Sequence, residues 1–379
     1  MRIIIGLAIL LLMSCQKQTS TTVNAVDSNS GEKMELEYAK TFTIDSYKDY
    51  YIVKIVEPWP AADRSYTYLF HKADAAIPDD LEVDLKLQIR ISKMIVSSTT
   101  HIPPIESLKE LESIIGFPNT SYISSPKARD LIDDSAIKDV GNSQSLNTEM
   151  ILDLQPRCIV TFAVKGENKA ITTLENANIP ILYNADWVEQ HPLGKTEWIK
   201  FFGLLFDKVD EANRIFNRIK TEYEDAKALA LNTSDKPTVM AGALWKDQWY
   251  LPGGKSWQAK LMKDANSNYL YADTEDTGSL SLSLETVLVK AKDAEFWVSP
   301  AQFTSYSQMT TENTFYNEFE AFTTQKVFTF AKDKGETGGL IYYELASHRP
   351  DWVLKDLIHI FHPELLPDYN AHFFKPLDP

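Results

Sequence analysis

The stretch "WYLPGGKSW", residues 249–257, comes closer than any other to a known catalytic motif. Its GGKS tail matches the end of a nucleotide-phosphate loop, in which backbone amides and a lysine bind phosphate. Such a loop also needs a glycine five positions before its last glycine, and Trp249 occupies that position. The spacing therefore excludes a nucleotide-hydrolysing loop. We expect Gly253 and Gly254 to form a tight turn before a helix that begins near Ser256.

Other residues with catalytic potential lack the partners that catalysis requires. His359 and His362 are spaced as neighbours on one helix face, but the HExxH pattern of a zinc protease is absent. Cys158 lies in the apolar run "RCIVTF", which favours a place in the core. The sequence contains no G-x-S-x-G nucleophile motif and no clear pair of catalytic carboxylates. We therefore expect a protein that is not an enzyme, needs no cofactor and binds no metal directly.

The N-terminus has the pattern of an export signal. "MRIIIGLAILLLMSC" has one arginine, an apolar run from Ile3 to Met13, and then Ser14 and Cys15. The run is shorter than the roughly 20 residues that a membrane span needs. Its end, "LLMSC", resembles the lipobox of bacterial lipoproteins, which implies that residues 1–15 are a signal peptide ending at a lipidated Cys15. The polar residues 16–35 are typical of a flexible tether.

The composition narrows the class of partner. The chain has 379 residues, 44% of them hydrophobic, which is enough for two domains with buried cores. Its net charge of −15 argues against a nucleic-acid partner, because phosphate contacts need a basic face.

Strands and helices alternate along most of the chain. Period-two stretches after residue 36 predict a lead-in β-hairpin or small antiparallel sheet, and βα units follow up to residue 193. From Gly194 to Ala230 apolar residues recur every three or four positions, which predicts one long amphipathic helix with Gly203 or Lys208 as places for a break. The βα pattern then restarts in residues 231–379. We expect an α/β fold of two similar lobes, 36–193 and 231–379, with mostly parallel sheets, a connecting helix 194–230 and a ligand cleft between the lobes.

Four stretches give the chain a resemblance to a known family. In chain order they are "VGNSQSLNTEMILDLQPRCIVTF", "ANIPILYNADW", "YLPGGKSWQAKLMKDANSNYLYAD" and "SLSLETVLVKAKDAEFWV". They resemble segments of the substrate-binding proteins of ABC importers that carry ferric siderophores, haem or cobalamin, whose two lobes are joined by one long helix. The early "YAKTFTID" and the late "HRPDWVLKDLIHIFHPELLP" resemble the iron-complex branch found in Bacteroidetes-type bacteria.

The resemblance implies a transport function. The protein would bind a ferric siderophore or a related iron complex and deliver it to a permease dimer that is driven by a separate cytoplasmic ATPase. It would be a monomer outside the cytoplasm, anchored to a membrane by its N-terminal lipid, most simply in the periplasm of a Gram-negative bacterium.

The resemblance also implies which residues dock on the permease. In the family one glutamate on each lobe pairs with permease arginines, and by motif these are Glu149 in "LNTEMIL" and Glu285 in "LSLETVL". Carboxylates on separate lobes would let a two-fold permease contact both at once. Each also suits the first turn of a helix capped by Asn147 or Ser283, where the helix dipole favours an acid.

Loops that follow the predicted strands supply the candidates for the ligand cleft, because ligands of parallel α/β sheets bind beyond the carboxyl ends of strands. Aromatic side chains offer rigid contact area to a flat chelate, and an arginine can bind carboxylate or catecholate oxygens with two hydrogen bonds. On these grounds the expected cleft residues are Thr100, His101, Ser125, Trp187, Trp245, Trp249, Tyr250, Phe303 and Arg349.

Two other functions stay open at this point. Cobalamin is the alternative cargo within the same family. The alternative of another class is an extracytoplasmic enzyme or scaffold on the same bilobal fold. An enzyme built around a metal cluster would need several cysteines, and Cys158 is the only cysteine after Cys15.

Overall fold

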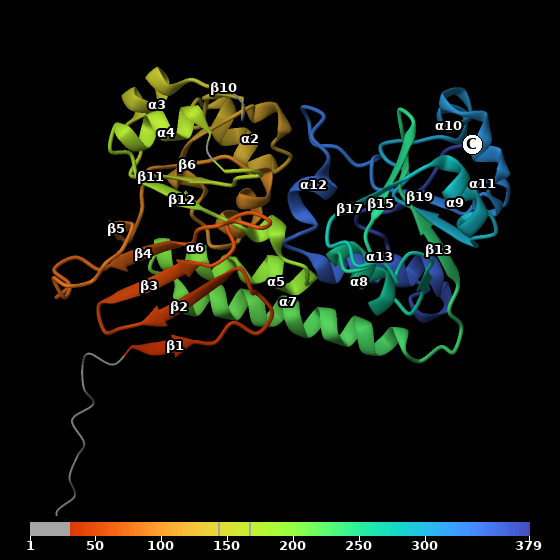
Figure 1. Cartoon of the computed structure of the whole chain (residues 1–379), viewed down its shortest axis with the longest axis horizontal. Helices are drawn as coiled ribbons and strands as arrows, with labels where there is room; N and C mark the ends of the chain where they lie inside the picture. Colours follow the sequence, from red (N-terminus) through yellow and green to blue (C-terminus); the bar gives the residue numbers. More distant parts are fainter. Residues whose placement is uncertain (1–30, 143–144, 167) are drawn as a thin grey trace, which may run out of the picture.

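The computed structural model describes residues 31–142, 145–166 and 168–379. Two α/β lobes lie at the two ends of one long helix, α7 (Val209–Ala230), which runs along the bottom of the molecule in Figure 1. The expected fold class, two lobes with mostly parallel sheets on one long helix, is confirmed. The predicted signal peptide with Cys15 lies outside the described residues.

The chain begins with a sheet that is larger than a hairpin. Its order is β1-β2-β3-β4-β5, antiparallel except for the parallel pair of β4 and β5. The strands are β1 (Glu32–Met34), β2 (Phe42–Ser46), β3 (Tyr50–Ile55), β4 (Tyr66–His71) and β5 (Leu85–Gln88). Since β1 begins at Glu32, the last residues of the predicted tether belong to this sheet.

The core of the N-terminal lobe is a parallel sheet with the order β12-β11-β6-β7-β8. Its strands are β6 (Met94–Val96), β7 (Ile114–Phe117), β8 (Lys138–Asp139), β11 (Cys158–Thr161) and β12 (Ile181–Tyr183), and the short pair β9 (Gly141–Asn142) and β10 (Ser145–Leu146) lies outside it. The helices are α1 (Ile102–Ser107), α2 (Pro126–Asp133), α3 (Thr148–Leu154) and α4 (Lys169–Asn176). Every residue of β6, β11 and β12 is buried, Cys158 included, as expected for strands covered on both faces.

The predicted connecting helix is divided into three helices, which are α5 (Pro192–Glu197), α6 (Ile199–Leu205) and α7. The chain leaves the helical conformation at Asp207, whose φ is +59°, so the break falls beside Lys208, one of the two predicted places. Gly203 lets α6 pack closely against the start of α7, because a Cβ at this position would lie only 2.6 Å from the Cβ of Ala212.

The C-terminal lobe repeats the plan of the first. Its main sheet has the order β16-β13-β18-β19-β20, parallel except for β20, and β14, β15 and β17 form an antiparallel sheet beside it. The strands are β13 (Thr238–Ala241), β14 (Ala243–Trp245), β15 (Gln248–Pro252), β16 (Asn268–Tyr269), β17 (Ser279–Leu282), β18 (Phe296–Val298), β19 (Val327–Thr329) and β20 (Lys375–Pro376). The helices are α8 (Trp257–Asp264), α9 (Leu284–Ala291), α10 (Tyr306–Glu312), α11 (Glu320–Thr323), α12 (Ile341–Leu345) and α13 (Pro350–Phe361).

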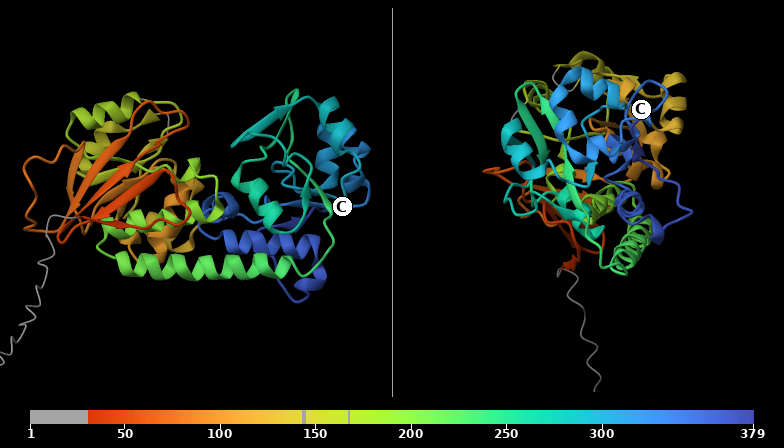
Figure 2. Two further views of the ribbon diagram at one scale, coloured as in Figure 1. Left: turned by 60° about the horizontal axis from the view of Figure 1, so that its bottom comes forward. Right: turned by 90° about the vertical axis from the view of Figure 1, so that its right-hand side faces the viewer.

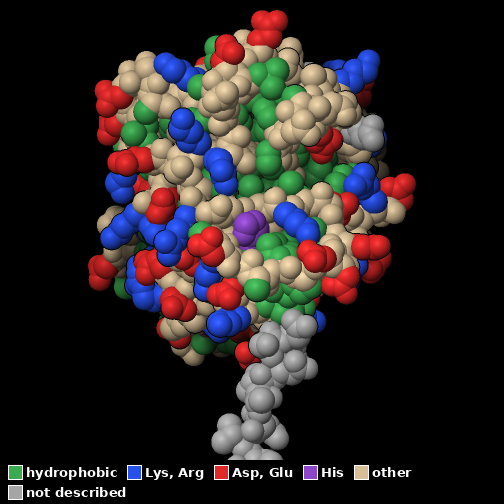
Figure 3. All heavy atoms as spheres, turned by 90° about the vertical axis from the view of Figure 1, so that its left-hand side faces the viewer, with side chains coloured by type: hydrophobic (Ala, Val, Ile, Leu, Met, Phe, Trp, Pro, Cys, Tyr) green, Lys and Arg blue, Asp and Glu red, His purple; other side chains and the backbone are tan. Residues whose placement is uncertain are grey.

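Helix α13 packs along α7 and fastens the second lobe to the connector, as Figure 2 shows. On the end of the molecule seen in Figure 3, basic and acidic side chains are interspersed. Within the described ranges, no helix is both long and apolar enough to cross a bilayer.

Candidate functional site

One segment of the C-terminal lobe reaches across to the N-terminal lobe. The carboxylate of Glu344 in α12 accepts hydrogen bonds from the backbone amides of Ser124 (2.6 Å) and Ser125 (2.8 Å), just before α2. Before α12, the hydroxyl of Thr337 donates to the carbonyl of Ser121 at 2.8 Å. We call residues 334–345 the α12 segment. It lies between the two lobes in Figure 1.

Glycines let the α12 segment approach the N-terminal lobe closely. A Cβ on Gly339 would lie 2.3 Å from the carbonyl oxygen of Tyr122, and one on Gly335 would lie 2.7 Å from the Cα of Ser124. Both distances are too short for any side chain, so the contact between the lobes depends on these glycines.

A cavity of about 700 Å³ lies against the α12 segment, and we call it the α12 cavity. The N-terminal lobe lines it with α1 and α2, the C-terminal lobe with α12 and α13, and α7 contributes Arg218. Its charged lining residues are six cations, Lys109, Lys127, Arg129, Arg218, Lys334 and Arg349, and three acids, Glu106, Glu336 and Glu344. In a chain of net charge −15, this is a local excess of positive charge that favours an anionic ligand.

Arg349 is held rigidly at the wall of this cavity. Its guanidinium forms two hydrogen bonds with the buried carboxylate of Asp351, at 2.9 and 2.6 Å. The same group lies 3.5 Å from Glu222 of α7 and 3.5 Å above the ring of Trp352. Such a fixed guanidinium can present its free edge to a ligand oxygen at little cost in conformational entropy.

Two buried polar atoms at the cavity have no hydrogen-bond partner among the described residues. They are Oγ of Ser124 and Nε of Arg129. Arg129 otherwise donates to the carbonyl of Thr120 at 2.7 Å and lies 3.6 Å from Asp133. Buried polar atoms without partners are costly, so these two point to a ligand or water that the cavity accepts.

A second cavity between the lobes, of about 900 Å³, is called the α8 cavity here. Its walls are the start of the lead-in sheet, the loop before α5, and α8 with the turn before it. Its cations are Lys40, Lys236, Lys255, Lys260 and Lys263.

The GGKS turn lies at the edge of the α8 cavity, but its amides are already used. Gly253 and Lys255 donate to backbone carbonyls of Gly278 and Asp276, and Gly254 donates to the hydroxyl of Thr274. Ser256 caps α8 through the amide of Ala259. A Cβ on either glycine would come within 2.4 Å of a backbone oxygen, so the glycines serve a close turn, as predicted.

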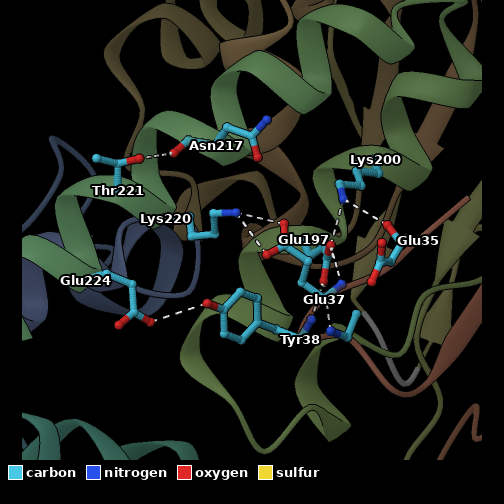
Figure 4. Close-up of polar contacts among 10 residues, drawn as sticks. Glu35, Glu37, Tyr38, Glu197, Lys200, Asn217, Lys220, Thr221 and Glu224 are labelled. Atoms are coloured by element: carbon cyan, nitrogen blue, oxygen red, sulfur yellow. Dashed lines mark hydrogen bonds and ion pairs between the residues drawn. The ribbon is translucent and has the colours of Figure 1, made fainter.

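Buried carboxylates fix the N-terminal wall of the α8 cavity, and Figure 4 shows one of them. Glu197 of α5 is fully buried and accepts hydrogen bonds from the amides of Glu37, Tyr38 and Ala39, at 2.8–3.0 Å. Lys200 of α6 pairs with it at 2.7 Å. Glu189 binds the next two amides in the same way. The segment that enters the lead-in sheet is therefore fastened to the connector helices.

The family model of "Periplasmic binding protein" matches residues 99–333, which is more than half of the chain. The chain belongs to this family. It is a periplasmic binding protein, the kind of protein that the sequence resemblance predicted.

Sequence similarity to a relative covers more of this periplasmic binding protein than the family match does. An uncharacterized lipoprotein of Methanocaldococcus jannaschii is 28% identical over 382 aligned positions, which cover 93% of this chain and 88% of the relative.

Solved structures share the fold. A periplasmic heme-binding protein of Roseiflexus sp. RS-1 superposes with a TM-score of 0.55 at 17% identity, over 72% of this chain and 99% of that chain. A periplasmic heme binding protein of Pseudomonas aeruginosa gives 0.57 at 15%, over 76% and 98%.

The nine expected cleft residues lie in different parts of the structure, and three of them lie at spaces between the lobes. Ser125 and Arg349 both line the α12 cavity. Thr100 lies nearby, in a small space between the lobes that also borders His348.

Two of the expected cleft residues are core residues. His101 is fully buried against Phe202, and burial lowers its pKa to about 4. Trp249 is fully buried too, packs on Trp297 with ring centroids 5.2 Å apart, and donates its indole N–H to the carbonyl of Ala241. The prediction that these two side chains line a cleft is wrong, because both are fully buried.

The other four expected residues do not line either of the two interlobe cavities. Trp187 is partly buried against the core, and Phe303 packs on Tyr316 with centroids 5.9 Å apart. Trp245 and Tyr250, 68% and 43% exposed, extend from the β14–β15 hairpin. Their role in a ligand contact stays a prediction.

Glu149 and Glu285 lie in the first turns of α3 and α9, on separate lobes (Figure 1). Both are exposed. Asn147 and Ser283 cap the two helices as expected. Hydrogen bonds from its own amide and from Ser283 lower the pKa of Glu285, so it is a stable anion.

Sequence reasoning missed Glu344, Arg129 and Lys334. Glu344 lies in a helix of five residues, and its partners are about 220 positions away in the chain, so no local pattern marks it. Within the described ranges, no group of three or more His, Cys, Asp or Glu side chains could hold a metal ion.

Proposed function

We propose that this periplasmic binding protein captures an anionic iron chelate, a ferric siderophore or a related iron complex, and delivers it to an ABC permease. The observation that carries the proposal is the α12 cavity, which joins both lobes and collects six cationic side chains in an acidic protein. Proteins of the same fold are described as binding heme or as possibly binding iron.

The size of the cavity suits such a cargo. Its volume of about 700 Å³ falls in the roughly 300–1,000 Å³ range of small-molecule sites. The iron would stay bound to the oxygens of its own chelator, and the protein would contact the anionic periphery. Arg349 and Arg129 would bind chelate oxygens, while the ring of Trp352 under Arg349 offers an apolar contact.

Delivery would use the exposed acids on the two lobes. Glu149 and Glu285 stand on different lobes, as a permease with two-fold symmetry would require. We propose that they pair with permease arginines, and that a lipid on Cys15 holds the protein outside the cytoplasm near the membrane.

Titration of the mature protein with ferric siderophores, haem and cobalamin tests the cargo. Trp352 beside Arg349 should report binding as a change in tryptophan fluorescence, with dissociation constants of roughly micromolar or tighter. A signal from cobalamin alone would favour the alternative cargo, and a flat response to the whole panel would contradict a transport function.

Uptake by intact cells tests delivery. Replacing Glu149 and Glu285 together by alanine should abolish uptake and leave chelate binding unchanged. Normal uptake by the double variant would refute the docking role.

A further inference from the structure

The carboxylate of Glu344 occupies an unusual position. It is 96% buried, its residue being 4% exposed, yet no lysine or arginine of the described residues lies within 4.0 Å of it. Its hydrogen-bond donors are the amides of Ser124 and Ser125, the two residues directly before the amino end of α2. This end of a helix carries a partial positive charge and free amides, and it binds anions readily.

Burial makes the contact electrostatically weak. It raises the pKa of Glu344 to about 7, with a further contribution from Glu106 of α1, although the two amides act in the opposite direction. His348 is neutral here, since burial lowers its pKa to about 3. The other charged groups around the cavity are Lys109, Lys127 and Arg129 of the N-terminal lobe, Arg218 of α7, and Lys334, Glu336 and Arg349 on the side of the C-terminal lobe.

The two unpartnered atoms add an independent observation. Oγ of Ser124 is buried beneath the glycines of the α12 segment, 2.9 Å from where a Cβ of Gly339 would lie. Nε of Arg129 is buried in the same cavity wall without a partner among the described residues. Glu344 therefore satisfies the two amides and leaves a hydroxyl and a guanidinium N–H unused.

We propose that the amino end of α2 is a carboxylate-binding site, which Glu344 fills in this structure and from which a carboxylate of the incoming ligand displaces it. The donors are the amides of Ser124 and Ser125, the hydroxyl of Ser124 and Nε–H of Arg129. Identifying the ligand as an iron chelate rests on the proposed function, but the site itself does not.

Displacement would also change the contact between the lobes. The bonds of Glu344 to the N-terminal lobe are reinforced by the Thr337–Ser121 bond, by the close packing of Gly335 and Gly339, and by the packing of α12 against residues 99–107. Just after α12, His348 and Ser107 share a hydrogen bond of 2.9 Å. Release of the carboxylate removes two of the hydrogen bonds that hold the α12 segment to the N-terminal lobe and so weakens that contact, while α13 and α7 stay packed. The segment thus acts as a built-in competitor that couples ligand entry to the arrangement of the lobes.

Amide hydrogen exchange at Ser124 and Ser125 in the full mature protein tests the site without any cargo. In Glu344→Ala both amides should exchange at least tenfold faster than in the wild type, and millimolar acetate should restore their protection. The control Thr337→Ala removes the neighbouring bond between the lobes and should leave the two amides protected. Unchanged exchange in Glu344→Ala, or no effect of acetate on it, would overturn the proposal.

Glu344→Gln covers the case in which the alanine variant does not fold. Its carboxamide has one acceptor oxygen, so only one of the two amides should stay protected. Full protection of both would contradict the carboxylate-specific site.

The affinity for a chelate is the second test of the proposed site. For a chelate with a free carboxylate, Glu344→Ala should bind several-fold more tightly than the wild type, because the internal competitor is gone. Weaker binding by this variant would contradict displacement. If no chelate binds any form of the protein, the proposed cargo fails, while the exchange and acetate results still decide the site.

Discussion

At the scale of single residues, the interlobe site is built from charges held in fixed positions. Arg349 shows this most clearly, because Asp351 and Glu222 orient it and Trp352 supports it from below. Asp351 is fully buried, so its charge depends on that arginine. The side chain of Arg349 therefore contributes both to the stability of the fold and to the proposed binding of the ligand.

Arg349→Ala should therefore destabilise the fold as well as weaken binding. Removing one partner of a buried ion pair costs about 3–5 kcal/mol, and because Arg349 is partly exposed we expect the lower end of that range. Urea denaturation of the variant measures the loss. The matched control is Arg214→Ala on the exposed face of α7, where a change of equal size would contradict the account.

Glu344 gives the protein a specific pH dependence. Its pKa in the docked α12 segment is about 7, above the ordinary value of 4.5, so the docked state binds a proton more tightly than the released state. Docking is therefore most stable below pH 4.5 and weakens as the pH rises to about 7, by a factor on the order of 100.

The measurement is the protection of the Ser124 and Ser125 amides between pH 4.5 and 8, corrected for the intrinsic exchange rate. Protection should fall toward pH 7 and then level off. Glu344→Gln should show no such pH dependence, and an identical profile in that variant would assign the effect to another group.

At the scale of elements, the connector is more than a spacer. Helix α7 carries a buried face of Ala212, Phe216, Ile219 and Tyr223, while α5 and α6 hold the entering chain through Glu197. The lead-in sheet is thus fixed to the same helices that join the lobes (Figure 4).

Glu197→Ala should release residues 37–39, while Glu189 still holds the amides of Lys40 and Thr41. The change removes three amide hydrogen bonds and leaves Lys200 buried without its partner, so we expect a loss of about 3–5 kcal/mol. Denaturation and limited proteolysis at this segment measure the effect. Glu37→Ala breaks only the half-exposed pair with Lys220 and should cost less than about 1 kcal/mol. Equal losses in the two variants would contradict the anchoring role of Glu197.

At the scale of the whole molecule, periodicity in the sequence was sufficient to predict two α/β lobes and the face of α7. The site was harder to predict, because it depends on contacts between distant segments. Trp249 and Tyr250 are adjacent in β15, and only the register of the strand decides that the first is buried and the second exposed. Arg349 could be named as a candidate because an arginine in a loop can bind carboxylate or catecholate oxygens with two hydrogen bonds, whereas Glu344 had no local pattern to mark it.

Binding of an anionic chelate in the α12 cavity is the basis of the proposed function. The direct measurement is the affinity of ferric siderophores for the wild type and for a variant with Arg218→Glu and Lys334→Glu, two cations that line this cavity. Lys236→Glu with Lys263→Glu reverses two charges in the α8 cavity as the control. We predict micromolar or tighter binding by the wild type and the control, and at least a hundredfold loss in the α12-cavity variant. Retained affinity in that variant, or loss in the control alone, would contradict the claim.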